Sequence, residues 1–364
     1  MKTEKCLLTL LFCGLCLFSF AQPSRETLTA LLGKMPRPPA LHVDTLEKTR
    51  VDKGWRFKIK YLAEDSDTYY HTPNDYIYAY LLVPFEAADH PLPGIIAIHQ
   101  DGPHDYLGKS EVAGLAGDPE QYYGKELFER GYIVICPDRF YHAQRRRISN
   151  PDTVADLYDN GYILMLDNWA GQLLCAGCTC MGKEVYDLER SMDVLYATKG
   201  VDWNRIGAIG HSAGGNVLAY SMFADPRVKA GASSCGVFEF ARWYDEDMPM
   251  KRYAFLAIPG FKDRATTADY VGMIAPRPFL MTRGTEEWGY DTPKTTQESL
   301  DHVNMTKKLE AAARVYYRKK NVSDRLKTIY FDENGGFHAF PPKVKETVCA
   351  WLDSYLKGTQ SSIP

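Results

Sequence analysis

A serine near the middle of this chain stands in a setting that suits nucleophilic catalysis. Ser212 is the centre of Gly210-His211-Ser212-Ala213-Gly214, which lies between an apolar run that predicts a strand and a pattern that predicts a helix. A G-x-S-x-G motif in that context is typical of a sharp strand-to-helix turn that exposes the serine hydroxyl above a sheet. Strand and helix crowd each other there, so we expect Gly210 and Gly214 to leave no room for a Cβ.

A serine hydroxyl becomes a strong nucleophile only when a base removes its proton, and that base is usually a histidine. Only His302 and His338 follow Ser212 in the sequence. His302 falls within a helix pattern, which favours a solvated or packing role. His338 lies in a glycine-rich loop, Gly335-Gly336-Phe337-His338, between the last predicted strand and the last predicted helix. We therefore predict that His338 is the general base.

A carboxylate should orient this histidine, and several acidic residues are candidates. The loop after the strand at 279–282 carries Glu286, Glu287 and Asp291. Glu287 is the preferred acid, because the acid of such a site generally lies a few residues beyond this strand. Glu286 and Asp291 stay open as alternatives, and Glu239 or Asp245 would be a displaced acid after the preceding strand.

An oxyanion formed on the substrate needs two N–H donors. Ala213 follows the serine and should supply one from the start of the helix. The loop His99-Gln100-Asp101-Gly102 follows a buried strand, and the N–H of Gln100 is the simplest second donor.

Composition excludes some classes of protein. The chain has 364 residues, is 45% hydrophobic and 24% charged, and carries a formal net charge of -3. That length suits one large domain with a well-filled core, and the near-neutral charge argues against a nucleic-acid partner.

The first 21 residues resemble a targeting segment rather than part of the fold. Lys2 and Lys5 precede an apolar run that is too short for a stable membrane anchor, and Ser19-Phe20-Ala21 matches a small-x-small cleavage site. We expect a signal peptide over residues 1–21, a mature chain beginning at Gln22 without a membrane span, and a periplasmic or secreted product. A lipoprotein signal ending at Cys16 matches less well.

Six cysteines remain after that segment. Cys175, Cys178 and Cys180 are closely spaced, but no second Cys or His pair stands at ligand spacing, so no metal and no other cofactor is predicted. A disulfide to Cys235 or elsewhere stays open.

The order of predicted elements indicates an α/β fold. Residues 22–54 contain a proline-rich piece and are expected to form an extended arm, 55–358 the catalytic domain and 359–364 a tail. Two alternating runs (55–62 and 77–84) predict antiparallel strands. After them strands and helices alternate, which predicts a mostly parallel central sheet with helices on both faces and long lid or loop insertions. The later strands are expected at 94–99, 133–136, 206–209, 228–235, 279–282 and 326–331, and helices at 119–130, 184–198, 216–223, 295–318 and 342–356.

With these motifs in place, the chain resembles the α/β-hydrolase superfamily from about residue 78 to 356. More narrowly, it is similar to bacterial dienelactone-hydrolase-like and acetyl-xylan-esterase-like serine esterases. The motifs that carry the resemblance are Ile98-His99-Gln100, Leu107-Gly108-Lys109, Pro137-Asp138, Gly210-His211-Ser212-Ala213-Gly214-Gly215, Ser233-Ser234-Cys235-Gly236, Ala275-Pro276-Arg277-Pro278 and Gly335-Gly336-Phe337-His338. Two departures matter: a glutamate stands where relatives often have aspartate, and a serine where dienelactone hydrolases have cysteine.

The resemblance implies a carboxylic-ester hydrolase that removes acetyl, methyl or glucuronoyl groups from a small molecule or polysaccharide. Trp288, together with Trp169, Trp243 and Tyr290, could stack on sugars or simply pack the loops. Arg146, within Arg145-Arg146-Arg147, could hold a uronate carboxylate or be paired internally. A serine peptidase on the same fold and a non-catalytic carbohydrate-binding relative are the alternatives.

Overall fold

The structure is a computed structural model that describes residues 22–65, 74–101, 106–145, 169–239, 257–287 and 296–358, with backbone only for 296–300. The predicted signal peptide and C-terminal tail lie outside these ranges, so the domain boundaries stay a prediction. In the described residues no helix combines the length and apolar character needed to cross a bilayer.

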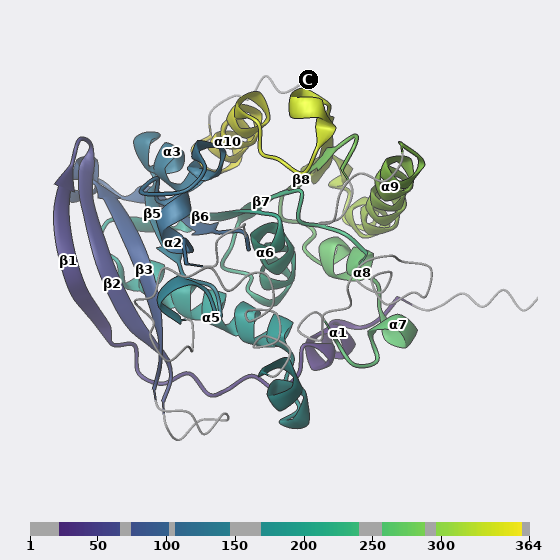
Figure 1. The fold of residues 1–364 in the computed structure, drawn as a ribbon, viewed down its shortest axis with the longest axis horizontal. Helices are drawn as coiled ribbons and strands as arrows, with labels where there is room; N and C mark the ends of the chain where they lie inside the picture. Colours follow the sequence, from purple (N-terminus) through teal and green to yellow (C-terminus); the bar gives the residue numbers. More distant parts are fainter. Residues whose placement is uncertain are drawn as a thin grey trace, which may run out of the picture.

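A single nine-stranded sheet forms the centre of the described part of the chain, in the order β1-β2-β3-β5-β4-β6-β7-β8-β9 (Figure 1). β1 to β3 pair antiparallel with one another, β3 pairs antiparallel with β5, and the remaining neighbours are parallel. The strands are β1 (Val43–Val51), β2 (Gly54–Glu64), β3 (Asp75–Pro84), β4 (Leu92–Ile98), β5 (Ile133–Pro137), β6 (Val201–His211), β7 (Ala230–Ser234), β8 (Phe279–Gly284) and β9 (Leu326–Phe331). The predicted mostly parallel sheet is confirmed.

Helices cover both faces of this sheet, because each face carries its own set of buried apolar side chains. One core packs β-strand residues against α1, α5, α6, α8 and α9, and the other packs them against α2, α3 and α10. The helices are α1 (Arg25–Leu31), α2 (Lys109–Val112), α3 (Tyr123–Glu129), α5 (Cys180–Ala197), α6 (Ala213–Ala224), α7 (Phe261–Arg264), α8 (Thr267–Gly272), α9 (Thr296–Lys319) and α10 (Pro342–Leu356).

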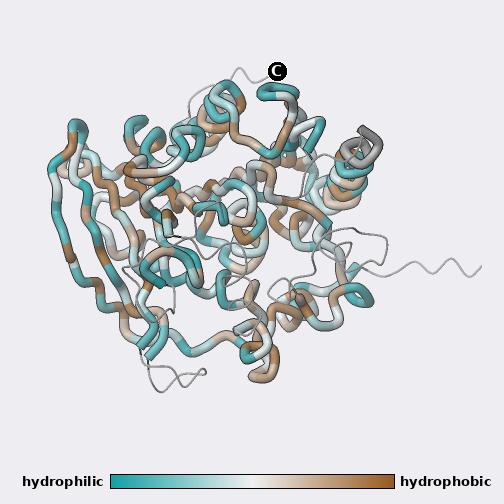
Figure 2. The backbone as a smooth tube through the Cα atoms, in the orientation of Figure 1, coloured by the Kyte–Doolittle hydropathy of each residue, from teal (hydrophilic) through white to brown (hydrophobic). Residues whose placement is uncertain are grey.

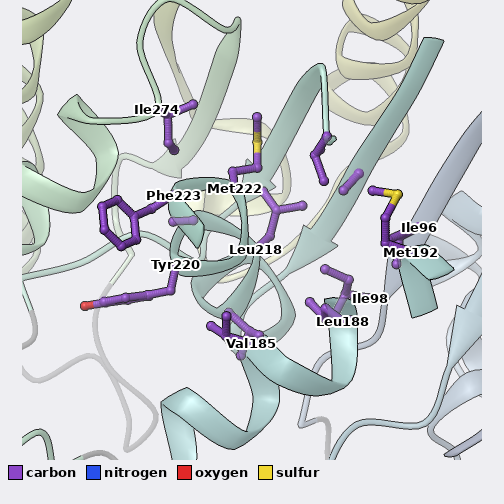
Figure 3. Close-up of a cluster of buried hydrophobic side chains, with 14 of the residues drawn as sticks. Ile96, Ile98, Val185, Leu188, Met192, Leu218, Tyr220, Met222, Phe223 and Ile274 are labelled. Carbon is purple, nitrogen blue, oxygen red and sulfur yellow. The ribbon is translucent and has the colours of Figure 1, made fainter. Parts of the chain in front are cut away.

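The core under α5 and α6 holds the strand that carries Ser212. Leu188 and Met192 of α5 and Leu218 and Met222 of α6 gather with strand residues such as Ile96 (Figure 3). Full burial of each such side chain stabilises the fold by roughly 1.5–3 kcal/mol. Strand β6 is therefore packed tightly on the face of the sheet that α5 and α6 cover. This packing also holds the turn at the C-terminal end of β6 in place.

The segment expected to be an extended arm is more structured than predicted. Residues 22–54 contain helix α1 and strand β1, and β1 forms a hairpin with β2 at the edge of the sheet. Most of β1 is exposed and its tube is largely hydrophilic in Figure 2. The sequence of β1 therefore lacks the apolar alternation by which a half-buried strand is predicted. Helix α1 packs on the core through the buried Leu28 and Leu31.

Candidate active site

The turn after β6 fixes Ser212 by backbone crowding. Ser212 has a φ of 53°, which is rare for a non-glycine residue, and its amide donates to Ser234 O at 2.8 Å. A Cβ on Gly210 would lie 2.5 Å from the Gly214 carbonyl, and a Cβ on Gly236 would lie 2.5 Å from Ser212 O. The predicted need for glycine at 210 and 214 is confirmed, and the strained turn aims the serine hydroxyl out of the sheet.

The loops that carry the acid and the histidine are joined to each other through their backbones. Gly284 ends β8, and a Cβ there would lie 2.1 Å from Gly336 O. The amide of Glu286 donates to Gly336 O at 2.9 Å. This close approach sets the loop after β8 directly against the loop that follows β9.

Three predicted residues meet at this edge of the sheet. His338 Nε2 lies 2.8 Å from Ser212 Oγ, and His338 Nδ1 lies 2.8 Å from Glu287 Oε1. Ser212 and Glu287 are buried, while the His338 side chain is part-exposed. A proton on Nδ1 bonded to the carboxylate leaves the Nε2 lone pair facing the serine hydroxyl, which is the arrangement of a general base.

Glu287 is held as a carboxylate by donors on several sides. Burial by itself raises its pKa, but the Arg283 guanidinium and His338 outweigh burial and lower the pKa to about 2. Arg283 Nη1 lies 2.5 Å from Glu287 Oε1, and the amide of Gly284 donates to Oε2 at 3.1 Å. The acid is therefore ionised throughout the range in which a histidine can act as base.

Three neighbours of this group were missed by sequence reasoning. Arg283 precedes Glu287 by four residues at the end of an apolar strand, a position that hints at an internal pair. The Cys235 thiol interacts with Glu287, and burial followed by that carboxylate raises its pKa, so it stays a thiol. The ring of His211 packs 4.9 Å from that of His338, and burial holds the pKa of His211 well below its usual range. Nothing in the spacing of Cys235 or His211 pointed to their contacts.

The two expected oxyanion donors flank the serine. Ala213 begins α6, so its N–H belongs to the helix turn that has no intrahelical acceptor. Gln100 follows β4, which runs parallel to β6 with Ile98 opposite Gly210. His99 accepts from the Arg139 amide through Nε2 at 2.9 Å and faces Gln100 O through Nδ1 at 2.6 Å, which fixes this loop. Their role in holding an oxyanion is a proposal.

The carboxylate bonded to His338 Nδ1 is that of Glu287, the preferred acid. The carboxylate of Glu239 accepts hydrogen bonds from the amide and hydroxyl of Thr267 at the start of α8. The backbone of Glu286 faces Gly336, and it is Glu287 whose carboxylate meets the histidine. Asp245 and Asp291 lie outside the described residues.

The predicted substrate-binding residues, Arg146 and Trp288, also lie outside the described residues, as do Trp243 and Tyr290. Their neighbour Arg145 is buried and pairs with Asp75 and Asp187, at 2.8 Å and 2.7 Å. Arg145 therefore serves internal pairing and is not free to hold a substrate carboxylate.

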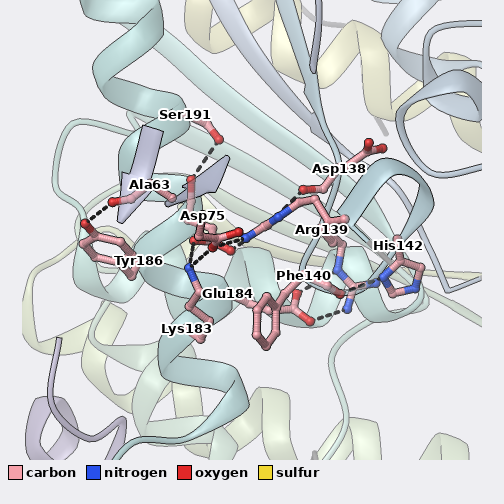
Figure 4. A network of polar contacts seen from close by, with 12 residues as sticks. Ala63, Asp75, Asp138, Arg139, Phe140, His142, Lys183, Glu184, Tyr186 and Ser191 are labelled. Carbon is pink, nitrogen blue, oxygen red and sulfur yellow. Dashed lines mark hydrogen bonds and ion pairs between the residues drawn. The ribbon is translucent and has the colours of Figure 1, made fainter. Parts of the chain in front are cut away.

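A second buried charge cluster lies under the antiparallel side of the sheet. Lys183 of α5 forms ion pairs with Glu64 and, at 2.6 Å, with Asp187. Its ion pair with Asp75, at 2.8 Å, can be followed in Figure 4. Nearby, Arg139 bridges Asp101 and Glu184 at 2.6 Å and 2.7 Å. We call Glu64, Asp75, Arg145, Lys183 and Asp187 the lysine cluster.

Among the described residues, two groups of ligand-type atoms lie close enough to surround a metal ion, and each has a protein cation beside it. Cys235, Glu287 and His338 form one, with Arg283 on the carboxylate; Glu64, Asp75 and Asp187 form the other, with Lys183 among them. A positive side chain beside the carboxylates opposes a metal ion at both places. The cysteines at 175, 178 and 180 form no disulfide in the described part of the chain, and Cys178 donates to Lys34 O.

Comparison with known proteins agrees with this geometry. Residues 180–359 match the model of the prolyl oligopeptidase family, a family of α/β-hydrolases. A relative from Bacillus subtilis (strain 168), described as a "Putative hydrolase YtaP", is 23% identical over 264 residues, which cover 72% of this chain and 80% of the relative.

Solved structures with the same fold include esterases. One described as a "putative acetyl xylan esterase" from Bacteroides fragilis NCTC 9343 superposes with a TM-score of 0.63 at 16% identity, covering 85% of this chain and 74% of that one. A glucuronoyl esterase from Solibacter usitatus superposes with a TM-score of 0.58 at 15% identity, covering 91% of each chain. Fold, motif order and family match agree, and the chain has the α/β-hydrolase fold.

Proposed function

We propose that this protein is a serine hydrolase of carboxylic esters. The observation that carries the proposal is the continuous contact from Ser212 Oγ through His338 to Glu287, with both hydrogen-bond distances at 2.8 Å. The solved esterases that share the fold support the choice of an ester bond.

The proposed reaction is a two-step acyl transfer. His338 Nε2 takes the proton of Ser212 as Oγ attacks the ester carbonyl, and the amides of Ala213 and Gln100 stabilise the resulting oxyanion. When the carbon–oxygen bond to the alcohol breaks, His338 returns the proton to the leaving alkoxide. Water then attacks the acyl-enzyme with His338 again as base, which releases the carboxylic acid and restores Ser212. Glu287 keeps its charge throughout and stabilises the imidazolium.

For the substrate, we propose an acetyl, methyl or glucuronoyl ester carried by a polysaccharide. The acetyl xylan and glucuronoyl esterases among the neighbours support this class, and Arg146 and Trp288 remain the proposed contacts. A screen on acetylated xylan, methyl-esterified pectin and glucuronoyl esters, reading acetate, methanol and uronate separately, tests it. If none of the three products is released, the proposed polysaccharide substrate is wrong. The proposal that the protein is an esterase would not be affected.

Replacement of the nucleophile tests the reaction itself. Ser212→Ala should abolish turnover of p-nitrophenyl acetate and labelling by a fluorophosphonate. Ser221→Ala is the matched control, because Ser221 is also buried on α6 but lies outside the Ser212–His338–Glu287 contact. Activity retained in Ser212→Ala would overturn the proposal.

A serine peptidase is the second candidate, and the matched family description favours it. Parallel assays with peptide and ester substrates of the same acyl group separate the two. A kcat/KM for the peptide above that for the ester would favour the peptidase, whereas a fluorophosphonate-inert protein would favour a non-catalytic relative.

We also propose that the protein is exported, on the basis of the charged and apolar segment in residues 1–21. Expression of the full chain in a Gram-negative host, followed by fractionation and N-terminal sequencing, should give a periplasmic or secreted chain that begins at Gln22. An uncleaved cytoplasmic chain, or one acylated at Cys16, would contradict this expectation.

A further inference from the structure

Arg283 is a buried cation whose only described ion pair is with the triad acid. Its side chain is 6% exposed, and Nη1 lies 2.5 Å from Glu287 Oε1, the oxygen that also faces His338 Nδ1 at 2.8 Å. Its other guanidinium nitrogen donates to the carbonyl of Val237 in the loop after β7. Arg283 thus joins the β7 loop, the end of β8 and the acid in one contact.

This geometry gives Arg283 two effects on the acid. It fixes one carboxylate oxygen in the direction of the histidine, because the guanidinium is itself held by Val237. It also places a positive charge beside the negative charge that stabilises the imidazolium, so the Glu287–His338 pair attracts its extra proton less strongly.

Other described groups packed against this pair carry little charge at neutral pH. From β6, His211 has its pKa lowered well below the usual range by burial and by His338. From the β7 loop, burial and then Glu287 raise the pKa of the Cys235 thiol. From β9, burial raises the pKa of Tyr330, which interacts with Arg283, to about 12. Arg283 is therefore the main charge acting on the pair from the described elements.

We propose that Arg283 is a positioning residue that fixes the orientation of Glu287 and sets the pH below which the site loses its base. The inference rests on the proposed serine-hydrolase function. Arg283 acts through Glu287 and touches no reacting atom.

The test compares Arg283→Met and Arg283→Lys with a matched control, Arg277→Met. Arg277 is part-buried and ties loops together at the other end of β8, through the carbonyls of Asp225 and Val228 at 2.8 Å and 2.9 Å. For each variant, kcat, KM and the pH dependence of kcat/KM on p-nitrophenyl acetate are measured from pH 4 to 9. The acidic limb of this profile is the fall of kcat/KM at low pH, where the base is protonated. The rate of Ser212 labelling by a fluorophosphonate should show the same limb, and it does not depend on any natural substrate.

In Arg283→Met, the acidic limb should move upward by about one pH unit, because the pair loses a neighbouring positive charge. kcat should fall at least tenfold while KM stays within about twofold. Arg283→Lys should keep the limb near its wild-type position but still lower kcat, since an ammonium cannot hold Val237 and Glu287 with the same geometry. Arg277→Met should lower thermal stability and leave the limb in place.

An unmoved limb in Arg283→Met, or an equal shift in Arg277→Met, would overturn the inference. If Arg283→Met does not fold, Arg283→Lys decides: a lowered kcat with an unmoved limb supports the inference, and wild-type kcat or a shifted limb overturns it. Failure of the proposed function has a different signature, which is a wild-type protein without ester turnover or labelling of Ser212.

Discussion

Glu287 and Glu64 are both buried glutamates beside a buried cation, yet their protonation differs widely. Arg283 and His338 outweigh burial at Glu287 and lower its pKa to about 2. At Glu64 burial dominates, Lys183 offsets only part of it, and Asp187 and Asp75 add repulsion, which raises the pKa to about 7. The balance of charges differs. Glu287 is paired with Arg283 and His338, whereas the lysine cluster holds three carboxylates and two cations, Lys183 and Arg145.

The difference agrees with the roles proposed for the two acids, an orienting role for Glu287 and a structural role for Glu64. A catalytic orienting acid must remain charged across the working pH range, so it needs an excess of donors. An acid in a structural cluster does not have to stay charged. It can take up a proton, which removes the free-energy cost of burying a carboxylate. Burial alone therefore does not identify a functional carboxylate in this molecule; the local count of cations and donors does.

The largest expected effect comes from neutralising each glutamate in turn. Glu287→Gln should lower kcat/KM for p-nitrophenyl acetate by about 10⁴, because the amide cannot stabilise the imidazolium or select the same tautomer. Glu64→Gln, the matched control, should stay within a few-fold of wild type. Equal losses in both variants would mean that the two glutamates do not differ as described.

Removing Lys183, one of the two cations of the lysine cluster, should mainly affect the free energy of unfolding. Lys183→Met leaves three buried carboxylates with Arg145 alone, and breaking such a buried arrangement costs about 3–5 kcal/mol. Urea unfolding at pH 8 gives the free energy of unfolding, and adding Glu64→Gln to Lys183→Met should restore part of it. If Lys183→Met loses less than about 1 kcal/mol of the free energy of unfolding, the carboxylates of the cluster do not depend on Lys183.

The two glutamates should give opposite pH dependences of stability. The folded state raises the pKa of Glu64, so wild type should lose up to about 3 kcal/mol relative to Glu64→Gln as the pH rises from about 4.5 to 7. The folded state lowers the pKa of Glu287, so wild type should lose stability relative to Glu287→Gln as the pH falls below about 4.5. Denaturant unfolding series of the three proteins at several pH values measure both slopes. Slopes of the same sign would contradict the comparison.

The smallest effect is expected for an exposed pair of the same chemical type. Lys58 of β2 lies opposite Glu47 of β1 at 3.0 Å, with the glutamate side chain 56% exposed. Lys58→Ala should change the free energy of unfolding by at most about 1 kcal/mol, and 0.5 M salt should remove most of that change. If Lys58→Ala lowers the free energy of unfolding as much as Lys183→Met does, solvent exposure does not explain the difference between the exposed and the buried ion pairs.

Periodicity and motif order were enough to predict the central architecture. The strands of the parallel region are buried apolar runs, which sequence reveals well, and the topology of such a sheet then limits where an acid and a histidine can lie. Ser212, His338 and Glu287 were selected by that order, and the structure brings them together.

Features that depend on partners distant in sequence were not accessible in the same way. Strand β1 is exposed and is defined by its pairing with β2, so its residues carry no apolar alternation. Arg145 belonged to a basic run that suggested a substrate contact, but its carboxylate partners are 42 and 70 residues away. Likewise, the role of Arg283 follows from contacts with two loops and not from its spacing alone.

The glycine crossing beneath Ser212 also bears on how this protein can be redesigned. Gly210, Gly214 and Gly236 pack backbone against backbone around Ser212, so main-chain atoms hold this serine in place. Side chains around the site can therefore be exchanged to change what it accepts, provided that these three glycines are kept.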